Sequence, residues 1–351
     1  MRILFLPNSY SSPPARFRIW QFIPYLEQMG HDVDVAVIQP DRKWSSKQQN
    51  GILRRLDHAL TVGRQILSIR DVLLRAEQYD VIMMNRDIVP EPRVTFLEPY
   101  LARRNPRLIF DFDDAIHLGQ REAKLRQVLP VFKHITPGNE YLAEFARQTN
   151  DNVTILPTVV DTSKFVPADE RESGVPRIGW SGSSSSARLN LPVLRPILEE
   201  LAQDTSLEFE FVVVSNEDPH IDWRGVKTRF VQWSPETEVL GIQLMDIGFM
   251  PLDDGPLERG KCGLKAIQYM ACGVTPVVSP VGVNEEIVVH GEHGYHARTH
   301  ADWIQWIKHL IANPDLNQQM GRAARQRAVD HYSIDYLLPH LLDVFERVKQ
   351  S

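Results

Sequence analysis

The chain has 351 residues, of which 43% are hydrophobic and 24% charged, and its formal net charge is -6 at pH 7. This length suits two domains better than one core, and the composition is typical of a globular protein. The acidic balance argues against general nucleic-acid binding, which needs a basic face. No apolar run approaches the roughly 20 residues of a membrane span, and Pro7 ends the first apolar run too early for a signal peptide. We expect a cytoplasmic protein or one that is peripheral at the inner face of the membrane.

Short apolar runs alternate with helical patterns in the first half of the chain. The patterns predict strands at 2–6, 33–38, 80–84, 107–110 and 153–156, and helices at 17–29, 52–77 and 141–148. Gly30 is a natural C-terminal cap for the first of these helices, and Gly63 suggests a break in the second. Strands that alternate with helices indicate βαβ units and a mostly parallel sheet.

The second half repeats this plan. Strands are predicted at 176–180, 208–214, 228–231, 247–250 and 275–278, and helices at 191–202, 264–270, 301–311 and 337–348. The segment 165–176 is polar and contains proline, so it is the expected domain boundary. We therefore predict an α/β fold of two doubly wound, Rossmann-like domains, 1–165 and 176–330, followed by a C-terminal segment, 331–351. Such domains bind ligands at the carboxyl ends of their strands.

The segment 258–286 reads as a glycine-broken loop, a helix, a buried strand and a second glycine turn. A loop rich in backbone amides that leads into a helix N-terminus is a natural site for a phosphate or sugar oxygen. Lys261 and Lys265 lie in this loop and helix. Cys262 and Cys272 lie nearby without the spacing of metal ligands, and we expect both to be packing residues.

Gly263-Leu264, the run 269–273 and the run 276–279 resemble the nucleotide-sugar site of retaining GT-B glycosyltransferases of family 4. Further segments resemble the same family in the same order: 30–33, 153–165, 246–252, 282–287 and 291–294. Two glutamates of the family motif are replaced here by Gly260 and Gln268. In the family's scheme the donor diphosphate itself helps to deprotonate the acceptor, which needs no protein nucleophile and is compatible with Gly260.

The resemblance implies two facing Rossmann-like domains, with acceptor-side residues in the first and the donor site in the second. The helix 337–348 would cross back to the N-terminal domain. The implied activity is transfer of a hexosyl group from a nucleotide-diphosphate sugar to a saccharide or lipid-linked acceptor, with retention, in polysaccharide or glycoconjugate biosynthesis. It implies no metal and no tightly bound cofactor. Two alternatives stay open: another GT-B reaction, such as inverting transfer or sugar-nucleotide epimerisation, and a catalytically weak module that binds a nucleotide sugar or a partner.

The family usually stabilises the leaving diphosphate with an Arg and a Lys from the first loop of the second domain. Here Trp180 and serines occupy those places. We hypothesise that Lys261 and Lys265 supply the positive charge, with help from Arg188 or Arg259, because fixed cations in a dry cleft stabilise developing negative charge. The alternative is that both lysines are ordinary surface residues.

The remaining donor-side candidates combine backbone amides with polar side chains. Ser181, Gly182 and Ser183 precede a helix, where hydroxyls cap and amides hold phosphate, or they form a flexible linker. Gln268 matches the family residue that holds the ribose hydroxyls, or it is an exposed helical residue. Glu286 matches a family glutamate near the donor, or it complements a helix dipole. Gly263 and Leu264 complete the donor-side set.

Acceptor-side candidates lie in the first half. Asp111, Asp113 and Asp114 end a predicted strand, where they orient sugar hydroxyls, hold a metal as Asp-x-Asp motifs do, or serve the structure alone. His117 is the nearest replacement for a histidine that the family has here. Arg16 and Arg18 begin the first helix and would suit an anionic acceptor.

The segment 42–75 combines many basic residues with apolar positions at helical spacing. A basic amphipathic helix in an acidic protein suggests docking on anionic lipid. The alternative is an ordinary helix that covers the sheet, with its arginines in solvent.

Overall fold

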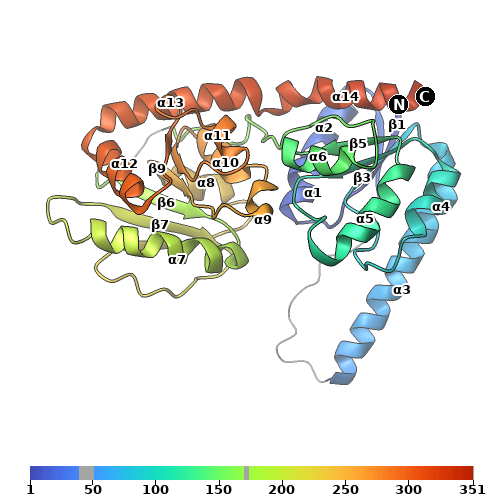
Figure 1. The fold of residues 1–351 in the computed structure, drawn as a ribbon, viewed down its shortest axis with the longest axis horizontal. Helices are drawn as coiled ribbons and strands as arrows, with labels where there is room; N and C mark the ends of the chain where they lie inside the picture. Colours follow the sequence, from blue (N-terminus) through green and yellow to red (C-terminus); the bar gives the residue numbers. More distant parts are fainter. Residues whose placement is uncertain (39–50, 170–173, 351) are drawn as a thin grey trace. The chain divides into compact units, whose positions relative to one another are not determined.

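The computed structural model describes residues 1–38, 51–169 and 174–350, with residues 51–59 described by their backbone alone. The chain divides into two compact units. Met1–Thr158 and Leu337–Ser351 form unit 1, and Val159–Tyr336 form unit 2. Each unit is built on one parallel sheet with helices, so the predicted α/β class is confirmed (Figure 1).

The sheet of unit 1 has the strand order β2-β1-β3-β4-β5, and every neighbouring pair is parallel. The strands are β1 (Arg2–Leu6), β2 (Asp32–Val35), β3 (Val81–Asn85), β4 (Leu108–Phe112) and β5 (His134–Pro137). β3, β4 and β5 are buried along their whole length, which is typical of parallel strands covered on both faces. The strand order reverses between β1 and β3, and ligands of such sheets bind at the carboxyl ends of the strands there.

Helices cover this sheet: α1 (Pro13–Arg18), α2 (Ile23–Gln28), α3 (Gly51–Arg75), α4 (Leu97–Arg104), α5 (Glu122–Val128), α6 (Glu140–Arg147) and most of α14 (Ile334–Gln350). Short 3-10 turns lie at Trp20–Phe22, Ala76–Gln78, Gly119–Arg121 and Leu129–Val131. The C-terminal helix α14 packs beside β1. The rings of Phe345 and Phe5 lie 6.1 Å apart, and Lys349 pairs with Asp80 at 3.7 Å. The two chain ends therefore lie close together within unit 1 (Figure 1).

The sheet of unit 2 is also parallel, with the order β11-β10-β9-β6-β7-β8. Its strands are β6 (Arg177–Ser181), β7 (Glu210–Ser215), β8 (Thr228–Gln232), β9 (Ile247–Met250), β10 (Thr275–Val278) and β11 (Tyr295–His296). Its helices are α7 (Ser184–Leu201), α8 (Glu238–Gln243), α9 (Pro256–Arg259), α10 (Leu264–Ala271), α11 (Asn284–Ile287), α12 (His300–Ala312) and α13 (Pro314–His331). The strand order reverses between β6 and β9, so the loops that follow these two strands begin side by side.

Several predicted elements differ from the structure. The segment 153–156 forms a single bridge from Val153 to Ile135 and no strand. The second strand ends at Val35 and does not reach 38. The first helix begins at Pro13, capped by the Ser12 hydroxyl, and it is interrupted by a 3-10 turn. No element was predicted for 314–331, where α13 lies with its proline at the first helical position.

Two further differences concern helix length. α3 runs without a break through Gly63, because a single glycine weakens a long helix without ending it. α7 begins at Ser184 and not at 191, because Ser183 caps it and accepts a hydrogen bond from the Ser186 amide. The predicted serine loop is therefore largely the first turn of a helix.

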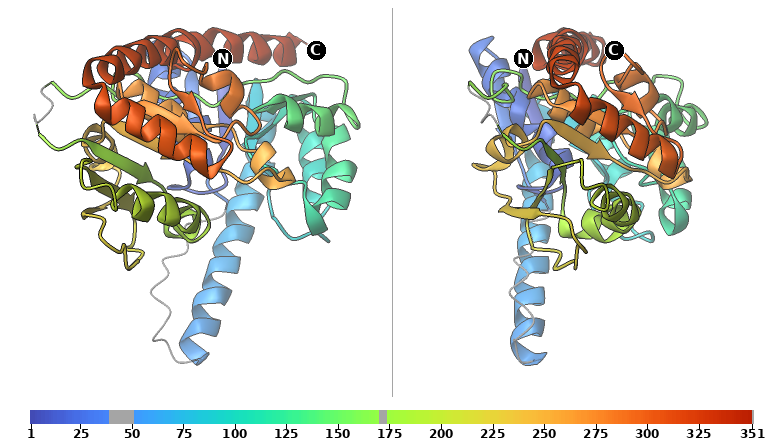
Figure 2. Two further views of the ribbon diagram at one scale, coloured as in Figure 1. Left: turned by 60° about the vertical axis from the view of Figure 1, so that its left-hand side comes forward. Right: turned by 90° about the vertical axis from the view of Figure 1, so that its left-hand side faces the viewer.

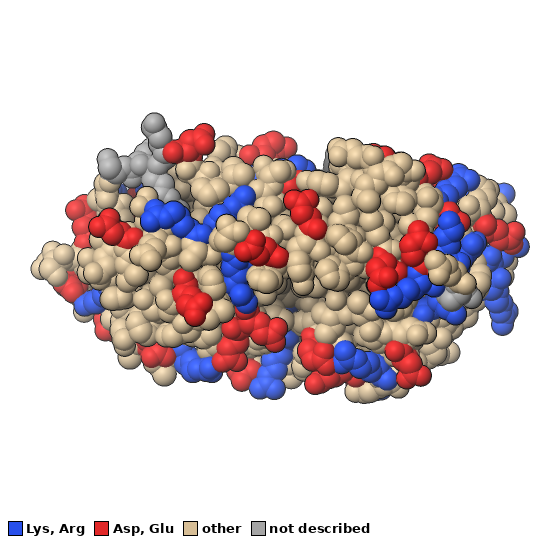
Figure 3. Space-filling model, turned by 90° about the horizontal axis from the view of Figure 1, so that it is seen from above, with Lys and Arg blue, Asp and Glu red and all other residues tan. Residues whose placement is uncertain are grey.

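Acidic and basic side chains are interspersed over the face that Figure 3 shows.

Candidate functional site

The loop after β6 begins at the point where the strand order of unit 2 reverses. The Ser181 amide donates to the Tyr269 hydroxyl at 2.9 Å, and that hydroxyl lies 3.3 Å from the Phe249 carbonyl oxygen. A side chain on Gly248 would lie 2.5 Å from the Tyr269 ring, so only glycine lets the ring pack on β9. Burial raises the pKa of Tyr269, which keeps the hydroxyl protonated. Tyr269, which the sequence did not single out as functional, thus fixes the end of β6.

Four amides in and after this loop already have protein partners. Gly182 donates its amide to Val214 at 3.0 Å, and Ser184 donates to the Asn216 side chain at 2.8 Å. Together with the Ser181 and Ser186 amides, these donors are satisfied without a ligand. A phosphate bound by the Ser181 and Gly182 amides, as the sequence suggested, would have to compete with these hydrogen bonds.

Lys265 supplies positive charge at the same place. Its Nζ lies 4.8 Å from the centre of the Trp180 ring and 3.3 Å from Asn190 Oδ1. A side chain on Gly182 would lie 2.5 Å from Trp180 and 3.1 Å from Lys265, so glycine leaves the space that this pair fills. Burial, and secondly the charge of Lys261, lowers the pKa of Lys265 to about 7. The structure thus unites Trp180 and Lys265, and a cation lies beside the loop where the family arginine was expected.

The other predicted cations of unit 2 are more exposed or paired. Lys261 Nζ lies 3.6 Å from Glu258 Oε1. Arg259 makes two hydrogen bonds to the Asp254 carboxylate, at 2.7 and 3.0 Å. Arg188 is exposed on α7. The two hydrogen bonds to Asp254 thus hold Arg259 within its own loop.

Two glycines let the loop before α10 approach the turn after β10. Gly263 has φ +68°, and a side chain there would lie 2.0 Å from Ile287 Cδ1. Gly282 has φ +56°, and its side chain would meet the Arg259 carbonyl oxygen at 2.9 Å. Both positions need glycine for backbone conformation and for space. Leu264, the first residue of α10, is half-buried.

Gln268 and Glu286 lie in different environments. Gln268 is buried and donates to Glu238 Oε1 at 3.2 Å, so the alternative of an exposed helical residue is wrong. Its amide nitrogen is directed at α8. Glu286 is exposed in the first turn of α11, and its backbone carbonyl accepts a hydrogen bond from Arg327 at 2.6 Å.

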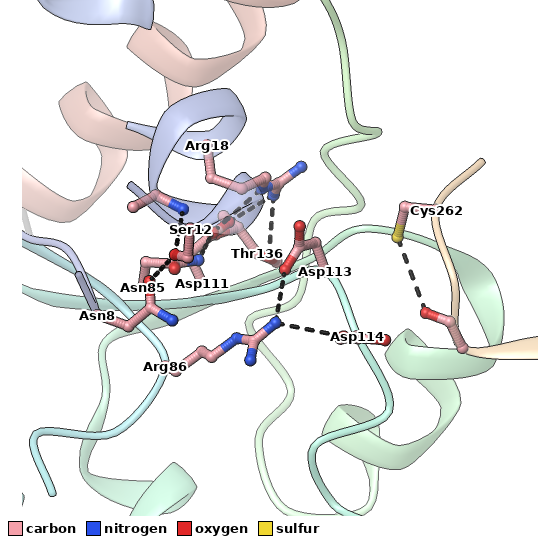
Figure 4. A network of polar contacts seen from close by, with 12 residues as sticks. Asn8, Ser12, Arg18, Asn85, Arg86, Asp111, Asp113, Asp114, Thr136 and Cys262 are labelled. Carbon is pink, nitrogen blue, oxygen red and sulfur yellow. Dashed lines mark hydrogen bonds and ion pairs between the residues drawn. The ribbon is translucent and has the colours of Figure 1, made fainter. Parts of the chain in front are cut away.

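In unit 1, Arg18 and Asp111 form a buried pair at the carboxyl end of β4 (Figure 4). Asp111 also accepts from the Asn85 amide and the Thr136 hydroxyl, each at 2.9 Å, and Arg18 donates to the Leu156 carbonyl at 2.6 Å. Asp111 is fully buried and Arg18 is 3% exposed. Both side chains are used internally, so Arg18 does not present its charge to an acceptor as expected. β4 also extends to Phe112, which places Asp111 inside the strand.

Arg86 holds the two aspartates that follow β4. Its Nη2 lies 3.5 Å from Asp113 Oδ1 and 3.4 Å from Asp114 Oδ2 (Figure 4). Burial raises the pKa of Asp113, while the positive charges of Arg86 and Arg18 oppose that shift. Arg86 has φ +71°, an unusual conformation for a side-chain-bearing residue that often marks functional sites. Sequence reasoning missed Arg86, although a polar run directly after a buried strand was a usable signal.

Buried charged side chains hold the loop that follows β3. Lys124 is 1% exposed; its Nζ lies 2.9 Å from Asp87 Oδ2 and 3.9 Å from Glu98 Oε1. Glu98 accepts the Ile88 amide at 3.1 Å. Removing one partner of such a network leaves an uncompensated buried charge, so the arrangement resists rearrangement. The buried pair of Asp87 and Lys124 therefore restrains the loop that carries Arg86.

The remaining acceptor-side candidates are packed against aromatic rings. His117 is 7% exposed and stacks on Phe145 at 4.3 Å, and burial lowers its pKa. Arg16 lies over the Phe17 ring at 5.0 Å. Among the described residues, no three His, Cys, Asp or Glu side chains gather as metal ligands would.

Comparisons with known proteins agree with the resemblance read from the sequence. Residues 225–327 match the family "Glycosyl transferases group 1". D-inositol 3-phosphate glycosyltransferase of Gordonia bronchialis is 34% identical over 98 residues, which are 27% of this chain and 21% of that protein. Alpha-maltose-1-phosphate synthase of Mycobacterium tuberculosis is 29% identical over 94 residues, 24% of each protein. The matched segment thus spans only a fifth to a quarter of these relatives.

Solved structures match nearly the whole chain. Sucrose-phosphate synthase from Thermosynechococcus elongatus has a TM-score of 0.71 at 14% identity, covering 99% of this chain and 98% of that one. HepE from Anabaena, in complex with UDP and glucose, has a TM-score of 0.66 at 14% identity, covering 98% and 99%. The predicted GT-B fold and the resemblance to glycosyltransferases are confirmed.

Proposed function

We propose that this chain is a glycosyltransferase that moves a hexosyl group from a nucleotide-diphosphate sugar to a saccharide or lipid-linked acceptor, with retention, in polysaccharide or glycoconjugate assembly. The observation that supports this best is Lys265, held over Trp180 where the strand order of unit 2 reverses. Unit 2 also contains the segment that matches the family. A half-buried cation beside a glycine-built loop stabilises the charge that develops on a leaving diphosphate.

The donor is proposed to bind unit 2. Lys265 contacts the diphosphate, and Lys261 joins it by leaving its partner Glu258, which is also half-buried. The amides at Gly263 and Leu264 face the same phosphates at the start of α10. Gln268 and Glu286 contact the nucleotide or sugar, and Arg188 and Arg259 supply further charge at the rim.

The acceptor is proposed to bind unit 1. Asp113 and Asp114 orient acceptor hydroxyls, and Arg86 keeps the two carboxylates in place. Carboxylates accept hydrogen bonds from hydroxyl groups and so select a sugar by the positions of its hydroxyls. Arg16 and His117 border this region.

UDP is the first nucleotide to test, because structures similar in fold were solved with UDP, UDP and glucose, or UDP-glucose. We would measure the unfolding temperature with UDP, GDP, ADP and CDP and then assay release of the matching sugar. A ligand at a hundredfold excess over its dissociation constant stabilises the folded state by about 2.7 kcal/mol. One nucleotide should raise the unfolding temperature selectively, and Lys265→Met should abolish the rise.

Lys308→Met is the matched control, because Lys308 lies in the same unit and pairs with Asp204 at 2.7 Å, outside the proposed site. No response to any nucleotide would contradict the donor site. Binding without turnover would favour the alternative, a module that binds a nucleotide sugar without rapid transfer.

The proposed location is the cytoplasmic face of a membrane, reached through the segment 42–75. Residues 42–50 lie outside the described residues, but Leu60, Arg64 and Ile66 are exposed on α3 and support this docking. None of the helices in the described ranges is long and apolar enough to cross a bilayer.

A further inference from the structure

α3 and α4 form an apolar groove of about 480 Å³ on the surface of unit 1. One wall contains Ile66, Ile69 and Leu73, which are three and four residues apart and so share one face of α3. Phe96 and Tyr100, at the start of α4 and one turn later, belong to the other wall. These aromatic residues are distant in sequence from α3 and were not part of the predicted membrane segment.

The side chains along this groove are unusually exposed for their type. The exposed fractions are 59% for Ile66, 59% for Leu74, 66% for Phe96 and 50% for Tyr100. Soluble proteins rarely leave so many large apolar side chains together in water unless they bind something. α3 also extends beyond the sheet of unit 1 (Figures 1 and 2).

The charges beside the groove have a net positive sign. Arg75 pairs with Asp71 at 2.5 Å, and Arg104, which lines the groove, pairs with Glu77 at 3.2 Å. Three exposed arginines have no acidic partner among the residues that the structure describes: Arg64, Arg70 and Arg103. This local excess lies in a chain whose net charge is -6.

We propose that the groove between α3 and α4 takes an acyl chain of an anionic phospholipid, with Arg70 and its neighbouring arginines at the phosphate groups. This deepens the membrane location in the proposed function by naming the groove and its ligand. Arginine forms paired hydrogen bonds with phosphate, and apolar side chains of this size favour the edge of the acyl region. A second copy of the chain fits less well, because a two-fold contact would place the same arginines against each other.

Vesicle flotation tests the proposal with the full chain. The protein should float with vesicles of 70% phosphatidylcholine and 30% phosphatidylglycerol and stay unbound with phosphatidylcholine alone. Arg70→Glu with Arg103→Glu should weaken the partition by at least about thirtyfold, since each arginine beside an anionic surface contributes on the order of fivefold. Phe96→Ser and Ile66→Ser should each weaken it by about tenfold, because each removes a large apolar contact.

Matched controls are Arg322→Glu and Leu240→Ser, two exposed residues of unit 2. They should float like the parent protein. Equal binding to neutral vesicles, or equal losses in the controls, would overturn the proposal. So would a dimer in solution that the Phe96→Ser change dissociates.

A fluorescent label gives a direct readout of burial in lipid. Cys262 and Cys272 are buried, so a single cysteine introduced as Phe96→Cys accepts an environment-sensitive dye selectively. Its emission should rise and shift to shorter wavelength with anionic vesicles, and a label at Leu240→Cys should not respond. No change at position 96 would refute insertion there.

The same variants separate this proposal from the donor site. Phe96→Ser should keep its unfolding-temperature response to nucleotide in the absence of vesicles. A variant panel that floats as expected but ignores all nucleotides would refute the donor site and leave the lipid groove intact.

Discussion

The lowered pKa of Lys265 makes donor binding depend on pH in a defined direction. Burial and the neighbouring Lys261 hold this pKa at about 7, below the ordinary value of 10.5. A bound diphosphate favours the protonated amine and therefore raises the pKa in the complex. Donor affinity is then fully present below pH 7 and falls as the pH rises above 7, until the pKa of the complex is reached.

The size of the effect follows from that pKa. At pH 7 about half of the free molecules carry the proton, so binding should take up about half a proton, rising to about nine-tenths at pH 8. The protonated fraction of the free protein falls from about one half at pH 7 to about one hundredth at pH 9. Affinity should therefore fall roughly fiftyfold over this range.

Titration calorimetry in two buffers of different ionisation enthalpy measures this uptake directly. The ligand titrated is the proposed donor, a nucleotide-diphosphate sugar, whose diphosphate stays ionised across the range. Lys265→Met should bind weakly with no uptake, and Lys308→Met should keep the parent's pH profile. Lys261→Met should shift the midpoint to higher pH, because it removes the charge that helps to lower the pKa of Lys265.

Stability without ligand should change in the opposite direction. The folded state holds the Lys265 pKa below its unfolded value, so between about pH 7 and 10.5 the unfolded chain binds more protons. The contribution of Lys265 to stability therefore improves as the pH rises through this window, and Lys265→Met should remove that slope. A parent protein with no proton uptake at pH 8, and an affinity that is flat from pH 7 to 9, would refute this account.

Three further substitutions test the geometry. Gln268→Glu, which restores the family residue, places a second carboxylate against the buried Glu238. It should lower the free energy of unfolding by about 1–3 kcal/mol at pH 8 and by less at pH 5. Urea denaturation at both pH values checks this. Tyr269→Phe leaves the Ser181 amide without its acceptor and should cost about 1–3 kcal/mol, with Tyr332→Phe as a control that leaves Ser181 untouched. Arg86→Gly keeps the backbone conformation, since glycine accepts φ +71°, and should lower the transfer rate about tenfold or more with donor affinity unchanged; an unaltered rate would remove Arg86 from the acceptor site.

Much of the fold could be predicted because local patterns repeat the long-range plan. The strands at 2–6, 247–250 and 275–278 were predicted with the bounds that the structure has. The errors have local causes. A hydroxyl cap at Ser183 began α7 a full two turns before its apolar pattern, and the polar α13 has no strong apolar stripe to reveal it.

Site residues were harder to predict, because a residue type does not tell which partner its side chain meets. Arg18 looked like a free cation beside an open loop, and it is buried against Asp111, far along the chain. Gln268 was expected to hold the ribose or to lie on the surface, and the structure shows it buried, with Glu238 on another helix receiving its hydrogen bond. Arg86 and Tyr269 acquire their positions only when neighbouring strands align.

The sequence by itself determined the α/β class, the positions of most strands along the chain and the glycine-built loop with its two lysines, since these follow from periodicity and from residue types at fixed spacing. Only the tertiary structure decided that Lys265 lies over Trp180, that Arg86 holds Asp113 and Asp114, and that α4 completes a groove with α3. Those pairings join segments far apart along the chain. Their energies depend on distance and burial, which no local pattern of residues encodes.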